Sequence, residues 1–320
     1  MVAPGPSPGS AWRSIILLAV AAAQQRDITI FYNVYMHNRT AAGLARTPVM
    51  IQQQLAAVKR SPAWPAVAEV RFATIGNPRG RETVLHACRK AAIGASKCVH
   101  LGHTNSGSEV TTLAPLHDFC RARPRALVAY LHVGFRWSPK TGALQRAALR
   151  GMASSACARA LRGDTCDVCA MRFSPLPYAH VPANMWMARC AYVHDLAPPA
   201  EFRRLMDALW RGKDCQHCFG HGRHALGHWV GSHPSLRACD TLAAPNAAPR
   251  PNFPLRLADA PRDRKNPRDR KNPCGMWGLH RKDSCQRTYR DVLEEWREIY
   301  GWVPASSRSR LKRYYLGGAE

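Results

Sequence analysis

The order of apolar and polar positions predicts alternating strands and helices in the first 131 residues. Runs rich in β-branched, aromatic or continuous apolar residues indicate strands, and apolar residues three or four positions apart indicate helices. Strands are expected at 28–35, 70–75, 98–101 and 126–131, and helices from 47 to about 58, from 82 to 92 and from 106 to about 123. Strands that alternate with helices at this spacing predict a parallel, doubly wound sheet.

Two helix starts carry local signals of their own. Thr47 is expected to cap a helix with Pro48 in its first position. Ser106 is expected to cap another, with Glu109 three residues later as its capping-box partner. From about residue 140 the pattern becomes helical, with amphipathic stripes at 202–210 and 289–300. The predicted fold class is therefore α/β, a mostly parallel doubly wound sheet with a helical C-terminal half.

The N-terminal segment has the features of a secretory signal. About ten apolar residues follow Arg13, too few to span a bilayer as a helix, and Ala21-x-Ala23 offers a cleavage site. If this segment, residues 1–23, were instead retained, it would anchor the chain to a membrane. In the lumen, Asn38-Arg39-Thr40 would be a glycosylation sequon.

Composition divides the rest of the chain. Residues 24–242 are expected to form the α/β domain, and 243–273 read as a Pro/Arg-rich disordered insertion. Residues 274–320 are expected to form a helical segment that packs on the same domain. The net charge of +25 is mostly Arg spread along the whole length, so we do not expect a nucleic-acid partner.

The twelve cysteines have two readings, which depend on the compartment. In an oxidising lumen they would form disulfides. In a reducing compartment the pairs Cys166/Cys169 and Cys215/Cys218 could complete a zinc site, and the chain would be a zinc-stabilised nucleic-acid-binding protein. The separation of about 45 residues between these pairs exceeds that of compact zinc modules, which favours disulfides.

Polar residues follow the apolar runs where ligands bind in such sheets, at the carboxyl ends of the strands. His132 comes directly after the most apolar predicted strand. A proline-rich loop then presents His180 and Asn184 just before Trp186, where we expect Asn184 to cap a helix.

These runs carry a resemblance. His180-Val181-Pro182-Ala183-Asn184-Met185-Trp186-Met187-Ala188 is similar to the His-x-x-Gly-Asn-(Phe/Met)-Trp-x-Ala signature of glycosyltransferase-like proteins that include a set from microalgae. Tyr130-Leu131-His132-Val133-Gly134 resembles their Tyr-(Leu/Met)-His-Ser-Lys-Gly motif, and matches continue from Phe31–Tyr35 to Tyr300–Ser307.

The resemblance implies an A-type nucleotide-sugar-transferase fold and glycosyl transfer in the secretory pathway, in the Golgi lumen or on secreted glycans. The partners would be a nucleotide-sugar donor and a glycan or protein acceptor. The resemblance implies a donor side that is formed by Asn33, Tyr35, His132 and Gly134. The acceptor or sugar side would be formed by His180, Asn184, Trp186 and Arg189, with Trp186 as a stacking face. Asp167 and Asp195 flank the signature and are the candidate catalytic bases.

The chain departs from these motifs at informative positions. The Lys after His132 is missing, and Ala183 stands where the signature has Gly. No Asp-x-Asp pair is present to hold Mn²⁺ or Mg²⁺ on a donor diphosphate, whose charge must be neutralised as it leaves. These departures leave open an alternative function, a catalytically inactive, secreted glycan-binding protein on the same scaffold.

Overall fold

The computed structural model describes residues 27–36, 41–133, 139–171, 181–209, 222–233, 236–241 and 250–251. The strands are β1 Ile28–Met36, β2 Val67–Gly76, β3 Cys98–Thr104, β4 Leu127–His132, β5 Val168–Ala170, β6 Trp186–Arg189, β7 Ala238–Asp240 and β8 Arg250–Pro251. The helices are α2 Ala41–Lys59, α3 Gly80–Lys90, α4 Val110–Ala122, α5 Pro139–Met152, α6 Ser155–Arg162, α7 Cys190–His194 and α8 Pro199–Leu209. Short 3₁₀ turns are η1 Trp64–Ala66, η2 Ala95–Lys97, η3 Pro182–Asn184 and η4 Gly222–Gly231.

The described strands form one mixed sheet in the order β3-β2-β1-β4-β6-β5-β7-β8. Strands β3, β2, β1 and β4 are parallel, whereas β6 runs antiparallel to both β4 and β5. The chain leaves β1 toward β2 and later returns to its other side with β4. The order therefore reverses between β1 and β4, and a ligand crevice is expected at their carboxyl ends.

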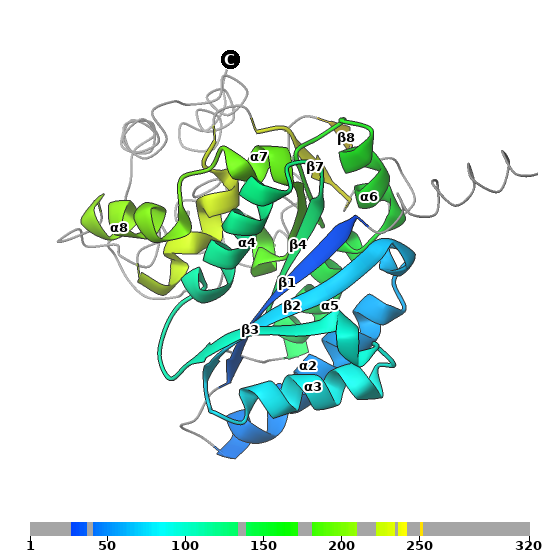
Figure 1. The fold of residues 1–320 in the computed structure, drawn as a ribbon, viewed down its shortest axis with the longest axis vertical. Helices are drawn as coiled ribbons and strands as arrows, with labels where there is room; N and C mark the ends of the chain where they lie inside the picture. Colours follow the sequence, from blue (N-terminus) through cyan, green and yellow to red (C-terminus); the bar gives the residue numbers. More distant parts are fainter. Residues whose placement is uncertain are drawn as a thin grey trace, which may run out of the picture.

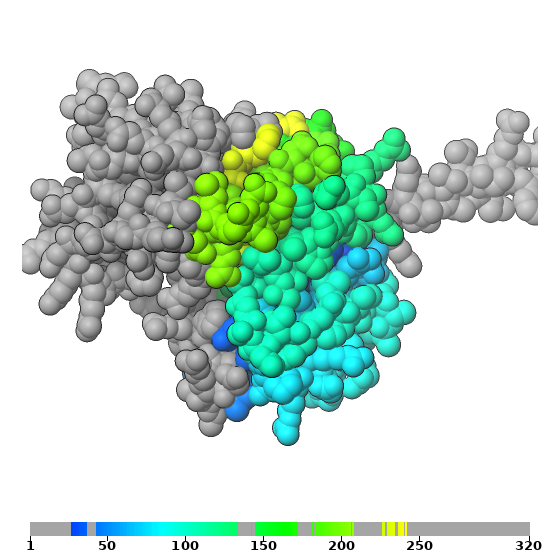
Figure 2. Space-filling model, turned by 60° about the vertical axis from the view of Figure 1, so that its left-hand side comes forward, coloured from blue at the N-terminus to red at the C-terminus, as the bar shows by residue number. Residues whose placement is uncertain are grey.

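Helices cover both faces of the sheet. Helices α2, α3 and α5 lie on one side, and α4, α7 and α8 lie on the other (Figure 1). Side chains alternate along β1 because successive residues of a strand point to opposite faces. Tyr32 belongs to the apolar cluster that faces α2, while Phe31 packs edge-on against Phe119 of α4. On the surface, α4 and the α7–α8 region form one continuous face (Figure 2).

Four disulfides join these elements, and all eight cysteines of the described residues take part in them. The pairs are Cys88–Cys98, Cys120–Cys190, Cys157–Cys169 and Cys166–Cys239. The first joins α3 to the edge strand β3, and the second joins α4 to α7. The third joins β5 to α6, and the fourth joins Cys166, two residues before β5, to β7. Cross-links of this kind restrict the unfolded chain more than the folded one.

The prediction of an α/β fold is confirmed, and so are the strands expected at 28–35, 70–75, 98–101 and 126–131. The expected helix start at Thr47 is wrong, because α2 already includes Ala41 and the Thr47 hydroxyl donates to the carbonyl of Gly43, one turn earlier. The expected helical C-terminal half is also wrong in part. Four short strands, β5 to β8, extend the sheet there and make it mixed.

The helices expected at 82–92 and 106–123 and the amphipathic stripe at 202–210 correspond to α3, α4 and α8, and α4 begins four residues later than predicted. The signal segment 1–23, the sequon at Asn38, the 289–300 stripe and nearly all of 243–320 lie outside the described residues. Among the described helices, none is both long and apolar enough to cross a membrane.

Candidate functional site

The carboxyl ends of β1 and β4 bring the first two candidate residues together. Asn33 and His132 are paired in the register of these parallel strands, and the Val133 amide donates to the Asn33 carbonyl at 3.0 Å. The Asn33 side chain is buried, where its Oδ1 accepts a 2.8 Å hydrogen bond from Thr112 of α4. Tyr35 lies two residues further along β1, half-buried, on the same face of the sheet.

Strand β6 adds the signature residues at the same edge. Because β6 runs antiparallel to β4 and pairs Trp186 with Tyr130, the preceding residues Ala183 and Asn184 come next to His132. Burial lowers the pKa of His132, while hydrogen bonds with the main chain of Ala183 and Val133 act in the opposite direction. His132 is therefore a neutral imidazole at pH 7 and supplies no positive charge.

A chain of hydrogen bonds links three elements at this edge. Asn184 donates from Nδ2 to Oε2 of Glu109 at 2.8 Å, and Nε1 of Trp186 donates to Oδ1 of Asn184 at 3.1 Å. The amide of Asn184 is thus held at both ends. The Tyr130 ring stacks on Trp186 with a centroid separation of 5.4 Å, and its buried hydroxyl has no hydrogen-bond partner of good geometry.

Glu109 is the most perturbed acid of the described site. Burial raises the pKa of its carboxyl group to about 7, and contacts with Tyr130 and Asn184 offset part of that rise. The residue as a whole is half-buried, so part of its surface still meets solvent. A carboxyl group with this pKa exchanges a proton near neutral pH, which is the property of a general base.

The backbone at the signature is strained. Ala183 has φ 64° and ψ 5°, and Asn184 has φ 45°, both in the left-handed region. Asn tolerates this region, but for Ala it costs about 1–2 kcal/mol. Glycine is the residue that adopts this backbone most easily. Strained backbone concentrates at ligand-binding and catalytic sites.

Two expectations for the signature residues are wrong. Trp186 is 1% exposed and packs between Tyr130 and Trp229, so it presents no stacking face to a sugar. It acts instead on the orientation of Asn184. Asn184 does not cap a helix, because a strand, β6, follows it. The local signals of a cap and of this turn are alike, and only the pairing with β4 decides between them.

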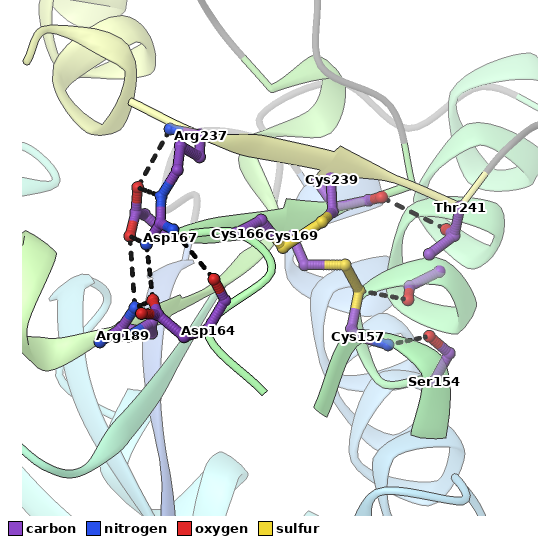
Figure 3. The surroundings of a disulfide bond; sticks show 12 residues. Ser154, Cys157, Asp164, Cys166, Asp167, Cys169, Arg189, Arg237, Cys239 and Thr241 are labelled. Atoms are coloured by element: carbon purple, nitrogen blue, oxygen red, sulfur yellow. Dashed lines mark hydrogen bonds and ion pairs between the residues drawn. A yellow bond between two sulfur atoms is a disulfide. The ribbon is translucent and has the colours of Figure 1, made fainter. Parts of the chain in front are cut away.

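Arg189 and Asp167 lie at the opposite edge of the sheet. Arg189 pairs with Leu127, the first residue of β4, and Asp167 precedes β5. Asp167 accepts from Arg237 at 2.7 Å and lies 3.6 Å from Arg189, and Asp164 forms ion pairs with the same two arginines (Figure 3). The Asp167 carboxylate is paired within this ion-pair network, far from His132. Asp167 therefore does not serve as the base of the candidate site, and Arg189 does not line its acceptor side.

The other candidates are dispersed. Asp195 is exposed, follows α7, and interacts with its neighbour His194 at 2.8 Å. Within the part of the chain that the structure describes, no hydrogen bond or ion pair joins it to Glu109 or His132. Gly134 and His180 lie outside the described residues.

The zinc reading of the cysteine pairs is contradicted. Cys166 is bonded to Cys239 and Cys169 to Cys157, so neither offers a thiolate to a metal (Figure 3). Their partners Cys215 and Cys218 lie outside the described residues.

A divalent ion on a diphosphate finds no adequate ligand set here. Within the described ranges, no cluster of three or more His, Cys, Asp or Glu side chains is placed to hold a metal. Glu109 is a single carboxyl group, and one of its oxygens already accepts from Asn184. The described residues therefore do not fit Mn²⁺ or Mg²⁺ at this site.

Glu109 is the site residue that sequence reasoning missed. Its position before α4 suggested a capping box, yet it makes no side-chain cap and α4 begins one residue later. Its partner Asn184 is 75 positions away, so no local pattern indicates the contact.

Fold and site together define an α/β protein with a polar site at the carboxyl edge of a mixed sheet, beside the point where the strand order reverses. The chain belongs to the family described as Domain of unknown function (DUF8361), whose model matches residues 31–311. Searches of the curated proteins and of the solved structures find no significant match.

Proposed function

We propose that this protein is a glycosyltransferase-like enzyme of the secretory pathway, which transfers a sugar from a nucleotide-sugar donor to a glycan or protein acceptor. The observation that carries the proposal is the junction of Glu109, Asn184 and His132 at one edge of the sheet. Two of these residues belong to motifs that resemble glycosyltransferase-like proteins. The third is a carboxyl group with a pKa of about 7.

The donor would occupy the crevice at the ends of β1 and β4. Asn33, Tyr35 and His132 line this edge, and neutral His132 would form a hydrogen bond to the donor rather than neutralise its diphosphate. The net charge of +25 favours the approach of an anionic donor from solution.

Glu109 would act as the general base. The acceptor hydroxyl oxygen forms a bond to the anomeric carbon, the bond from that carbon to the diphosphate oxygen breaks, and its electron pair leaves with the nucleoside diphosphate. The hydroxyl proton moves to the Glu109 carboxylate. Asn184, held by Trp186, would keep one carboxylate oxygen in place and leave the other for the acceptor.

The disulfides support the compartment. Eight cysteines in four disulfides are typical of proteins that fold in an oxidising lumen, and are rare in the cytosol. This agrees with the signal-like N-terminal segment.

Thermal-shift measurements on the oxidised full chain test the proposal, with nucleoside diphosphates and nucleotide sugars, each with and without manganese. A bound ligand raises the melting temperature by mass action. We expect one nucleotide series to do so and His132→Ala to abolish the shift, while the exposed His194→Ala retains it. No shift from any nucleotide, with folded and oxidised protein, would refute a donor site.

A second candidate function is a catalytically inactive glycan-binding protein. The neutral state of His132, the missing Lys of its motif and the charge of +25 favour this candidate. It predicts salt-sensitive retention on a heparin column, unchanged in Glu109→Gln, and no nucleotide shift. A nucleotide shift that depends on His132 would contradict it.

A further inference from the structure

Basic side chains gather at the amino ends of β2 and β3, at the edge of the sheet opposite the candidate functional site. Helices α2 and α3 pack against each other on one side of the sheet, and both run toward this edge (Figure 1). Helix α2 ends there at Lys59, α3 at Lys90 and the turn η2 at Lys97. Three segments thus bring together a basic cluster of five residues, which are Lys59, Arg60, Arg89, Lys90 and Lys97.

An aromatic ring holds two members of the basic cluster in place. Nζ of Lys59 lies 4.7 Å from the centre of the Trp64 ring, and Nζ of Lys97 lies 5.0 Å from it. Nζ of Lys97 also donates a 2.9 Å hydrogen bond to the carbonyl of Val67, the first residue of β2. Cation–π contacts position an ammonium group without neutralising its charge. Both lysines therefore keep their positive charge at a fixed place beside the half-buried Trp64.

The other three members of the basic cluster are exposed side chains. Arg60 follows α2, and Arg89 and Lys90 end α3. The Cys88–Cys98 disulfide joins the last turn of α3 to the first residue of β3, and so keeps these two charges next to η2. No ion pair between described residues joins Arg60, Arg89 or Lys90 to a carboxylate. The fold gathers these charges and does not neutralise them.

A comparison with the end of α4 shows what distinguishes the basic cluster. The Cζ atoms of Arg71 and Arg123 lie 5.0 and 5.2 Å from the centre of the Phe119 ring. However, Arg71 is paired with Glu69 at 2.7 Å, and Phe119 is buried. That group therefore carries less free charge and offers no ring surface to a ligand, whereas Trp64 is half-buried.

We propose that the basic cluster binds a sulfated polysaccharide, with Trp64 as an aromatic surface for a sugar ring. A polyanion that neutralises several basic groups releases its condensed counterions, and this release favours binding. The disulfides indicate an oxidising compartment, which favours a polysaccharide over a nucleic acid as the polyanion. The inference gives a place to the glycan-binding candidate function. It does not depend on glycosyl transfer, because His132 lies at the other edge of the sheet.

Titration calorimetry with a heparin octasaccharide, on the oxidised full chain at several salt concentrations, tests this inference. Each lost contact with a polyanion lowers both the affinity and its salt dependence. The triple variant Arg60→Gln/Arg89→Gln/Lys90→Gln should therefore bind about 10- to 100-fold more weakly at about 0.15 M salt. The slope of log K against log salt concentration should become shallower by about 2–3. A desulfated octasaccharide should bind the natural chain more weakly than the sulfated one.

A matched control removes the same number of charges from dispersed positions. Arg81→Gln/Arg159→Gln/Arg204→Gln changes exposed residues of α3, α6 and α8. Because separated surface charges are screened by salt, this control should change the affinity by less than about 3-fold. All substituted residues are exposed, so both triple variants should keep the melting temperature of the natural chain, which verifies that they are folded.

Equal losses of affinity in the two triple variants would show that the charge acts diffusely. This result would overturn the site and leave glycan binding by the protein intact. Absence of octasaccharide binding by the natural chain would overturn the inference as well. Tighter binding of a single-stranded DNA of equal charge, or of phosphatidylserine vesicles, would assign the basic cluster to another class of partner. Loss of a nucleotide-induced thermal shift in the Arg60→Gln/Arg89→Gln/Lys90→Gln variant would contradict the separation of this site from the donor site.

Discussion

Replacing Ala183 by glycine tests whether the turn before Asn184 is strained. At φ 64° the alanine methyl costs about 1–2 kcal/mol, which glycine removes. Against this, glycine loses about 0.5–1 kcal/mol more conformational entropy on folding. Removing a half-buried methyl group costs about 0.4 kcal/mol, half the value of a fully buried one. The net effect of Ala183→Gly on the free energy of unfolding should lie between about −0.4 and +1.1 kcal/mol.

Ala57→Gly is the matched control. Ala57 is also half-buried and packs on the same apolar cluster, but it lies inside α2, where Ala→Gly destabilises by about 1 kcal/mol. The two variants should therefore differ by about 0.6–2 kcal/mol, or at least about 1 °C in melting temperature under oxidising conditions. If Ala183→Gly lowers the melting temperature as much as Ala57→Gly, the strain at position 183 is refuted.

Three further predictions concern stability. Because the pKa of Glu109 rises from 4.5 to about 7 on folding, the native state holds a proton that the unfolded chain releases, and the contribution of Glu109 to stability falls as pH increases between those values. The melting temperature of the natural chain should therefore fall relative to that of Glu109→Gln between about pH 4 and 8, and a difference between the two proteins that stays constant across this range would contradict the raised pKa. Asp167→Asn should destabilise the protein by about 1–3 kcal/mol, because it leaves Arg189 and Arg237 short of a partner. The exposed Asp164→Asn should cost less, and the reverse order in denaturant unfolding would contradict the central place of Asp167 in the ion-pair network. Removing the Cys166–Cys239 disulfide by double alanine substitution should lower the free energy of unfolding by about 4 kcal/mol, since it closes a loop with a sequence separation of 73; a loss below about 1 kcal/mol in the same assay would show that the cross-link restricts the unfolded chain little.

The parallel half of the sheet could be predicted because its strands are long and distinctive. The 28–35 run is rich in β-branched and aromatic residues, and the 126–131 run is continuously apolar, as is typical of buried parallel strands. Strands β5 to β7 have three or four residues each, and a run this short does not show whether it is helix or strand. Their state is decided by pairing with strands far away in the sequence.

The candidate site could be predicted only where motifs mark it. His132 and Asn184 carry the resemblance, and the antiparallel entry of β6 brings them together. Glu109 could not be found, because its environment comes from Tyr130 and Asn184, which reach it through the tertiary fold. The expectation for Asp167 is wrong for the opposite reason. Asp167 is close to the signature in sequence, but the fold places it at the other end of the strands.

The antiparallel pairing of β4 with β6 has a consequence for how the chain folds as it is made. Strand β4 ends at His132, but β6, which covers its free edge, begins only at Trp186. Until that later segment emerges, a nascent domain with β1 to β4 in place would display an apolar strand edge able to pair with another chain. Chaperones would be most needed during this interval of synthesis, and a chain cut after residue 133 should aggregate where the full chain does not.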